Sequence, residues 1–209
     1  MKDNRNYHWI KNFSMRPEFP YIENWITNGS KVIDLACGNG SLLALLKEKK
    51  RVFELGIEIT QSGVDCCVER GINARAGRID VELKDIPNDS FDFSICNVTL
   101  QMVMYPEVTL QEMKRISKYQ IVSFPNFGHL LNRIELLFEG RMPTKLLGGY
   151  SWYNTGYIHQ LSIKDFEEIV SSLDLTIKAA VYSIRGRKFN ELILLPNLFA
   201  AIGIFLTEK

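Results

Sequence analysis

Short apolar runs alternate along the chain with segments whose apolar residues recur at helical spacing. The runs predict buried strands at Lys31–Leu35, Val52–Ile57, Ile72–Ala76, Phe91–Asn97 and Gln120–Phe124. The intervening segments predict helices at Ser41–Lys50, Ser62–Arg70 and Thr109–Ser117. Strands that alternate with helices in this way predict parallel strands joined by right-handed crossovers, with helices on both faces of the sheet.

The alternation ends in the last third of the chain. Helices are expected at Leu130–Phe138 and Ile163–Leu173, and strands near Thr176–Ser183 and Ala200–Thr207. No obvious helix separates these last two strands, which favours an antiparallel pair at the edge of the sheet. Because no Pro/Gly/Ser-rich linker interrupts the pattern, we expect one domain over residues 1–209.

Composition narrows the function classes. The chain of 209 residues is 46% hydrophobic and carries a formal net charge of +1, which argues against disorder and against a strongly basic nucleic-acid-binding protein. The apolar tail Phe199–Leu206 is too short to cross a bilayer, and no signal sequence precedes the first strand. The cysteines form no C-x-x-C pair and the histidines show no metal-ligand spacing. We therefore expect a cytoplasmic protein with reduced thiols, no metal and no membrane or nucleic-acid partner.

The segment after the first predicted strand carries the clearest chemistry. It reads Asp34-Leu35-Ala36-Cys37-Gly38-Asn39-Gly40 and leads directly into a helix. The glycines permit a tight turn against which a ligand can lie, and the helix directs its free N–H groups to the same place. Asp34 would repel a pyrophosphate and attract an amine or a sulfonium group.

An acid also follows the second predicted strand. Glu58 is placed to accept hydrogen bonds from both hydroxyls of a ribose. A nicotinamide-dependent oxidoreductase would also use such an acid. That alternative requires a third glycine, whereas residues 38–43 read Gly-Asn-Gly-Ser-Leu-Leu.

These loops resemble those of the class I S-adenosylmethionine-dependent methyltransferases. The stretch Asp34–Gly40 resembles their first motif, with Ala36 in place of a glycine, and Glu58 with Ile59 resembles their ribose-binding position. Ile79 falls where backbone groups contact adenine, although Arg78 stands where the family has an acid, and Asn97 matches the fourth motif. The resemblance implies a Rossmann-like fold with a mostly parallel seven-stranded sheet, an antiparallel edge strand and bound S-adenosylmethionine or S-adenosylhomocysteine.

Several longer blocks are similar to one subfamily, the MetW family of methionine biosynthesis proteins. The blocks are Arg16-Pro17, Thr99–Gln101, Ser123–His129, Gly140–Pro143, Trp152–Thr155, Ile158-His159, Ile163–Phe166 and Pro196–Leu198. The likeness runs from about residue 16 to residue 207. It implies a protein of methionine biosynthesis that binds S-adenosylmethionine and supports homoserine O-acyltransferase. The alternative it leaves open is an active methyltransferase that acts on a small molecule.

Methyl transfer would need a base near the acceptor. His129 and Tyr153 are the candidates for catalysis, and His159 is a weaker one. His129 follows the end of the fifth strand, where it would either face the cofactor or cap the next helix. The segment from about 130 to 158 is long and rich in apolar residues, which predicts either a lid over the acceptor pocket or a surface for a partner enzyme.

Overall fold

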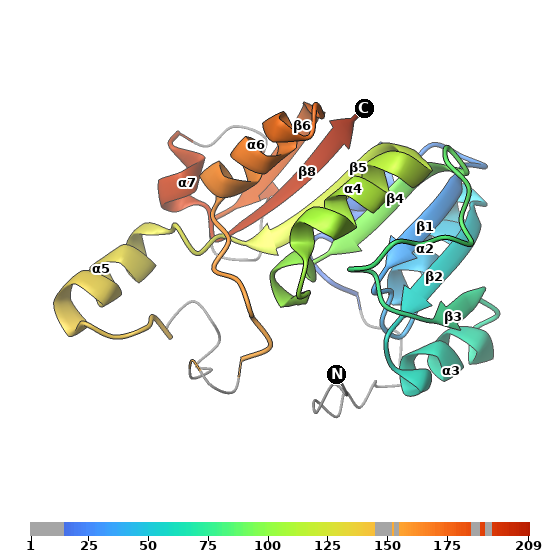
Figure 1. Ribbon diagram of the computed structural model, residues 1–209, viewed down its shortest axis with the longest axis horizontal. Helices are drawn as coiled ribbons and strands as arrows, with labels where there is room; N and C mark the ends of the chain where they lie inside the picture. The colour runs from blue at the N-terminus through green and yellow to red at the C-terminus, as the bar shows by residue number, and fades with distance from the viewer. Residues whose placement is uncertain (1–14, 145–151, 153–154, 185–188, 191–193) are drawn as a thin grey trace.

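The computed structural model describes residues 15–144, 152, 155–184, 189–190 and 194–209 (Figure 1). Its centre is a mixed sheet with the strand order β3-β2-β1-β4-β5-β8-β6-β7. The strands are β1 (Lys31–Leu35), β2 (Phe53–Glu58), β3 (Ala74–Ala76), β4 (Phe91–Asn97), β5 (Ser117–Pro125), β6 (Thr176–Ser183), β7 (Phe189–Asn190) and β8 (Ile202–Glu208). Strands β1 to β5 are parallel, and β8 is antiparallel to both of its neighbours, β5 and β6.

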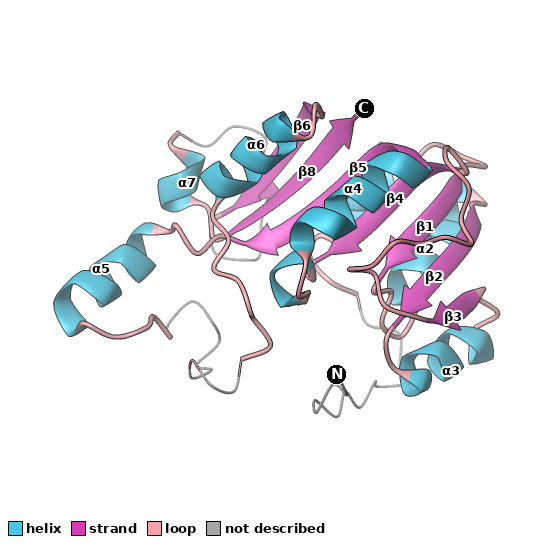
Figure 2. Cartoon of the chain, in the orientation of Figure 1, coloured by secondary structure: helices cyan, strands magenta, loops and turns pink. Residues whose placement is uncertain are grey.

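Helices cover both faces of this sheet, as Figure 2 shows. They are α1 (Phe19–Trp25), α2 (Ser41–Lys50), α3 (Gln61–Glu69), α4 (Pro106–Ile116), α5 (Leu130–Glu139), α6 (Ile163–Ser172) and α7 (Pro196–Phe199), with a 3-10 turn at Leu100–Met102. Residues of α1 and α2 share one apolar core with Val32, Ile95 and Ile121. Residues of α4 and α6 share the other with Ile33 and Phe124. Strands buried on both faces explain the near-continuous apolar runs of the sequence.

The expected fold class is confirmed, while several boundaries differ. Strand β5 begins at Ser117, earlier than the apolar run suggests, because Ser117 is itself buried and pairs with Phe91 of β4. The last strand begins at Ile202 because Pro196 starts a short helix before it. Strand β7 adds a short antiparallel pairing with β6 at the outer edge.

The topology brings the predicted functional loops together. The strand order reverses between β1 and β4, and ligands of open α/β sheets bind at the carboxyl ends of strands beside such a reversal. Strand β1 pairs with β2 in a register that places Leu35 opposite Ile57. The loops that follow these two strands, with Asp34 and Glu58 at their bases, therefore meet at one edge of the sheet.

Candidate functional site

The loop between β1 and α2 is a sharply turned main-chain segment. Ala36, Gly38 and Gly40 have φ angles of 72°, 57° and 74°. The N–H groups of Ala36 and Cys37 both donate to the carbonyl of Ile57 on β2, at 2.8 and 3.1 Å. This left-handed backbone favours glycine, so Ala36 carries strain that glycine would avoid.

Asp34 is a buried carboxylate at the base of this loop. Only 3% of the residue is exposed, and no described residue donates a hydrogen bond to its Oδ1 atom. Burial and the nearby charge of Glu58 raise the pKa of Asp34 to about 7, while Arg16 opposes the shift. A second negative charge close by and an unpartnered oxygen together favour a cationic ligand group here.

Glu58 connects the two loops. Its Oε2 atom accepts a hydrogen bond from the N–H of Gly38 at 3.0 Å, and its Oε1 atom accepts from the N–H and the hydroxyl of Thr60 at 3.1 and 2.9 Å. Glu58 is 3% exposed, so the carboxylate lies inside the structure. Oε1 already accepts two hydrogen bonds, whereas Oε2 keeps one lone pair that could accept from a ligand hydroxyl.

Small residues and two thiols allow these loops to pack closely. A Cβ atom on Gly40 would lie 2.8 Å from the Sγ atom of Cys67, and one on Gly63 would lie 2.6 Å from Cγ of Glu58. The Sγ atoms of Cys37 and Cys67 are 3.7 Å apart. Sequence reasoning missed Gly63 and Cys67 because their partners lie far away in the chain. The signal that could have predicted this contact is the glycine in the first turn of α3, where a side chain would prevent close packing against the loop.

The remaining residues predicted to bind the cofactor lie around the same edge. Leu35 is fully buried, Asn39 accepts from Ser41 through Oδ1, and Ile59 is 49% exposed beside Glu58. Ile79 is buried and its carbonyl accepts from the hydroxyl of Thr109. Cofactor contacts of these residues stay predictions.

Asn97 belongs to a network that the sequence did not reveal. Its Nδ2 atom donates to Glu18 at 3.2 Å, and its Oδ1 atom accepts from the hydroxyl of Ser123 at 2.5 Å. Glu18 is only 4% exposed and pairs with Arg16 at 3.3 Å. Arg16 of the Arg16-Pro17 block and the Glu18 that follows the block therefore bring a cation and a further acid to the ends of β4 and β5.

Arg78 is engaged by an acid two residues later. Its guanidinium donates to both oxygens of Asp80, at 3.0 and 2.8 Å. Asp80 also accepts from the N–H of Met104, and although burial raises its pKa, these hydrogen bonds bring the net pKa below the usual value. Arg78, at the position where the resemblance implied an acid, is thus neutralised within its own loop.

His129 caps helix α5. Its Nδ1 atom accepts from the N–H of Leu131 at 3.0 Å, so the ring is neutral with the proton on Nε2. Burial lowers the pKa of His129, which is 7% exposed. This is the capping role that the sequence left open beside catalysis. Tyr153, the other catalytic candidate, lies outside the described residues.

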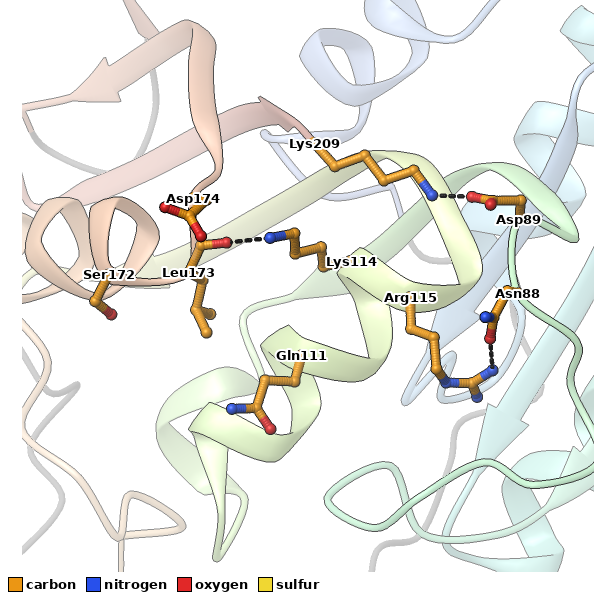
Figure 3. A pocket seen from close by; sticks show the side chains of 9 residues that line it. All are labelled: Asn88, Asp89, Gln111, Lys114, Arg115, Ser172, Leu173, Asp174 and Lys209. Atoms are coloured by element: carbon orange, nitrogen blue, oxygen red, sulfur yellow. Dashed lines mark hydrogen bonds and ion pairs between the residues drawn. The ribbon is translucent and has the colours of Figure 1, made fainter.

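A hollow of about 420 Å³ lies at the amino ends of β4 and β5, on the side of the sheet opposite to these loops (Figure 3). Its cations are already engaged: Lys114 donates to the carbonyl of Leu173, Lys209 pairs with Asp89, and Arg115 donates to Asn88. The amino ends of parallel strands are not where such sheets bind ligands. We therefore place the candidate site at the carboxyl edge.

Comparisons with known proteins point to one family. The model of the family described as methionine biosynthesis protein MetW matches residues 16–207. The bifunctional methionine biosynthesis protein MetXA/MetW of Rhodopirellula baltica is 32% identical over 167 residues, which cover 75% of the chain but 27% of that relative. The ubiquinone/menaquinone biosynthesis C-methyltransferase UbiE of Methylococcus capsulatus is 31% identical over 44% of the chain and 41% of its own length. The matched part of the chain thus spans less than half the length of each of these relatives.

Solved structures show the same fold. An S-adenosylmethionine-dependent methyltransferase of Thermotoga maritima matches with a TM-score of 0.70 and 16% identity, over 92% of the chain and 87% of that structure. One from Mesorhizobium loti matches with a TM-score of 0.68 and 14% identity, over 92% of the chain and 98% of that structure.

In the described part of the chain, no helix has the length and apolar character of a membrane span. Nor do those residues group three metal-binding side chains.

Proposed function

The chain belongs to the MetW family of methionine biosynthesis proteins, and from that premise we propose that its β1–α2 loop binds S-adenosylmethionine or S-adenosylhomocysteine in support of homoserine O-acylation. The observation that carries the proposal is the buried Asp34 carboxylate, whose Oδ1 atom has no donor among the described residues. A cation is the ligand group that best offsets this charge. S-adenosylmethionine carries both an ammonium and a sulfonium group.

The residues present fit such a nucleoside. Asp34 would receive a cationic group, and the turned backbone at Ala36, Gly38 and Gly40 would let the ligand approach the main chain. Glu58 would accept from a ribose hydroxyl through Oε2. When bound, S-adenosylmethionine supplies an activated methyl group. S-adenosylhomocysteine lacks the sulfonium charge but keeps the ammonium group and the ribose.

The partner part of the proposal rests on the MetXA/MetW relative, whose name joins two activities in one chain. We assign the partner surface to helix α5, which projects from the end of the sheet (Figure 1). Its C-terminal residues Leu137 and Phe138 are 75% and 80% exposed. An apolar helix face of this kind is typical of protein contacts.

A coupled assay tests this role. Homoserine O-acyltransferase from the same organism would be assayed alone, with the full chain, and with the full chain plus S-adenosylmethionine. We expect the acyltransferase to be more active with the chain and to co-purify with it. An acyltransferase that is equally active with and without the chain would contradict the accessory role.

A second candidate is methyl transfer to a small molecule. A partly enclosed cavity lined by Gln101, Pro125 and His159, at the carboxyl ends of β4 and β5, favours it. Labelled methyl from S-adenosylmethionine would then appear in a metabolite extract, and Asp34→Ala would abolish the transfer. If the chain binds the cofactor but transfers no label to any extract, methyl transfer is contradicted and the accessory role is the proposal that remains.

A further inference from the structure

Two thiols meet where the β1–α2 loop packs against helix α3. Cys37 lies in the loop, Cys67 lies in the last turn of the helix, and their Sγ atoms are 3.7 Å apart. We infer that these two cysteines are a redox modification site, at which a small peroxide converts the thiol pair into an intrachain disulfide that ties the loop to α3. The thiol chemistry itself does not depend on cofactor binding or methyl transfer.

The fold distinguishes this pair among the four cysteines of the chain. All four are buried and carry free thiols. Cys37 and Cys66 are similarly exposed, at 8% and 6%, whereas Cys67 and Cys96 are fully buried. Within the described residues, the contact between Cys37 and Cys67 is the one hydrogen bond that joins two sulfur atoms. Proximity therefore separates this pair from the other two cysteines, whose exposure is much the same.

Glycines leave the space in which the two sulfurs lie. A Cβ atom on Gly56 would be 2.5 Å from Sγ of Cys37, and one on Gly40 would be 2.8 Å from Sγ of Cys67. A disulfide bond is about 2.05 Å long, so the two sulfur atoms must approach each other by roughly 1.6 Å. Because Sγ of Cys67 also contacts the carbonyl of Gly38 at 3.5 Å, this approach shifts the main chain of the loop.

The two thiols differ in their surroundings, which gives each a separate role. Cys37 is the residue of the pair with exposed surface, and hydrogen peroxide is little larger than water. The hydrogen bond to Cys67 and burial raise the pKa of Cys37, and the same hydrogen bond lowers the pKa of Cys67. Cys37 therefore meets the peroxide, slowly because its thiol keeps its proton, and Cys67 supplies the nucleophile of the second step.

The oxidation balances with one hydrogen peroxide as the oxidant. The sulfur of Cys37 attacks one peroxide oxygen, the O–O bond breaks, and the leaving hydroxide takes the thiol proton as water, which leaves a sulfenic acid on Cys37. The sulfur of Cys67 then attacks the sulfenic sulfur, the S–O bond breaks, and the hydroxyl leaves with the Cys67 proton as a second water. The two sulfurs lose two electrons, the peroxide gains them, and one S–S bond forms.

Mass spectrometry tests the modification site. The full chain, reduced and then freed of reductant, would be treated with hydrogen peroxide at low protein concentration, its remaining thiols alkylated and its peptides mapped. We expect two peptides joined through Cys37 and Cys67, with a mass about 2 Da below that of the two free peptides, and dithiothreitol should separate them again. Absence of this bridge, or bridges through Cys66 or Cys96 in equal amount, would overturn the inference.

Matched alanine variants assign the bridge, because Cys66 and Cys67 are adjacent in the sequence. Cys66→Ala and Cys96→Ala should each keep the reversible mass loss, whereas Cys37→Ala and Cys67→Ala should each lose it. Thermal melts would verify that each variant is folded, and the wild-type peptide map decides the question if one is not. A reversible mass loss that persists in the folded Cys67→Ala variant would contradict the assignment.

The bridge also has a consequence for the ligand, and this part rests on the proposed function. The N–H of Gly38 donates to Oε2 of Glu58 at 3.0 Å, and Oε2 is the oxygen proposed to accept from a ribose hydroxyl. A shifted loop disturbs this arrangement. We therefore expect the oxidised chain to bind S-adenosylhomocysteine about tenfold more weakly than the reduced chain, the usual effect of one lost hydrogen bond.

Calorimetric titration of S-adenosylhomocysteine into the reduced and the oxidised chain measures this consequence. Equal affinities would overturn redox control of the loop. No binding to the reduced chain would contradict the proposed function, and with it the effect on the ligand, whereas the bridge between Cys37 and Cys67 is judged by the peptide map alone.

Discussion

At the scale of single residues, the carboxylate of Asp34 explains most about the site. Sequence reasoning identified Asp34 and Glu58 from their places after buried strands, because strand ends and acids are visible in the printed chain. It could not reveal that Oδ1 of Asp34 has no donor among the described residues, or that Glu58 accepts a hydrogen bond from the N–H of Gly38. Those facts depend on contacts between loops that are remote in sequence.

The raised pKa of Asp34 gives a pH-dependent stability. Between the unfolded pKa near 3.8 and the folded pKa near 7, the folded chain holds a proton that the unfolded chain has lost, so stability falls as pH rises. Asp34→Asn removes this titration. We expect the variant to gain about 3 kcal/mol over wild type between pH 5 and pH 8 in urea unfolding. An unchanged difference between the two proteins across that range would contradict the assigned pKa.

His129 offers a second test at this scale. If the ring acts as a cap, His129→Ala should cost about 0.5–2 kcal/mol of stability, and His129→Asn, a favourable capping residue, should restore part of it. Urea unfolding measures both. A loss of labelled methyl transfer in the stable Asn variant would instead support the catalytic role that the sequence allowed.

At the scale of elements, helices and strands with strong periodicity were predictable and their ends were less so. Strand β4 and strand β6 have the bounds that the sequence predicted. The short helix α7 and the early start of β5 were missed, because a few residues around Pro196 carry no periodic signal and Ser117 is buried only through pairing with β4. A local sequence pattern therefore predicts the type of an element more reliably than its first and last residues.

The contact between α3 and the β1–α2 loop can be tested with matched glycine variants. Gly40→Ala and Gly29→Ala impose similar backbone strain, since their φ angles are +74° and +75°. A Cβ atom at Gly29 meets nothing within 4 Å, whereas one at Gly40 meets the Sγ atom of Cys67 at 2.8 Å. We expect Gly40→Ala to be less stable than Gly29→Ala by about 1–3 kcal/mol in urea unfolding. Equal losses would show that the Cys67 contact does not constrain the loop.

At the scale of the whole molecule, the parallel half of the sheet followed from the alternation of strands and helices. The insertion of β8 between β5 and β6 did not, because only the full set of pairings determines which strand lies inside. The segment from about 130 to 158 was expected to be a lid or a partner surface. Its helix α5 exposes apolar side chains, and its role stays a prediction.

The proposed partner surface leads to a matched comparison. Phe138 at the end of α5 and Phe53 at the start of β2 are 80% and 69% exposed. Phe138→Ser should weaken homoserine O-acyltransferase binding by about tenfold or more, as expected for an aromatic interface anchor, whereas Phe53→Ser should not. Surface plasmon resonance with immobilised acyltransferase measures both. Equal effects of the two variants on acyltransferase binding would show that α5 is not part of the interface.

The central claim is that Asp34 and Glu58 flank a site for S-adenosylmethionine, and calorimetric titration tests it most directly. We expect saturable heat with S-adenosylmethionine or S-adenosylhomocysteine and much weaker binding of NAD. Glu58→Ala should weaken ligand binding by about 1–3 kcal/mol. The control Glu82→Ala removes an exposed acid and should leave the binding free energy unchanged. Absence of binding to both adenosyl ligands, or tighter binding of NAD, would contradict the account.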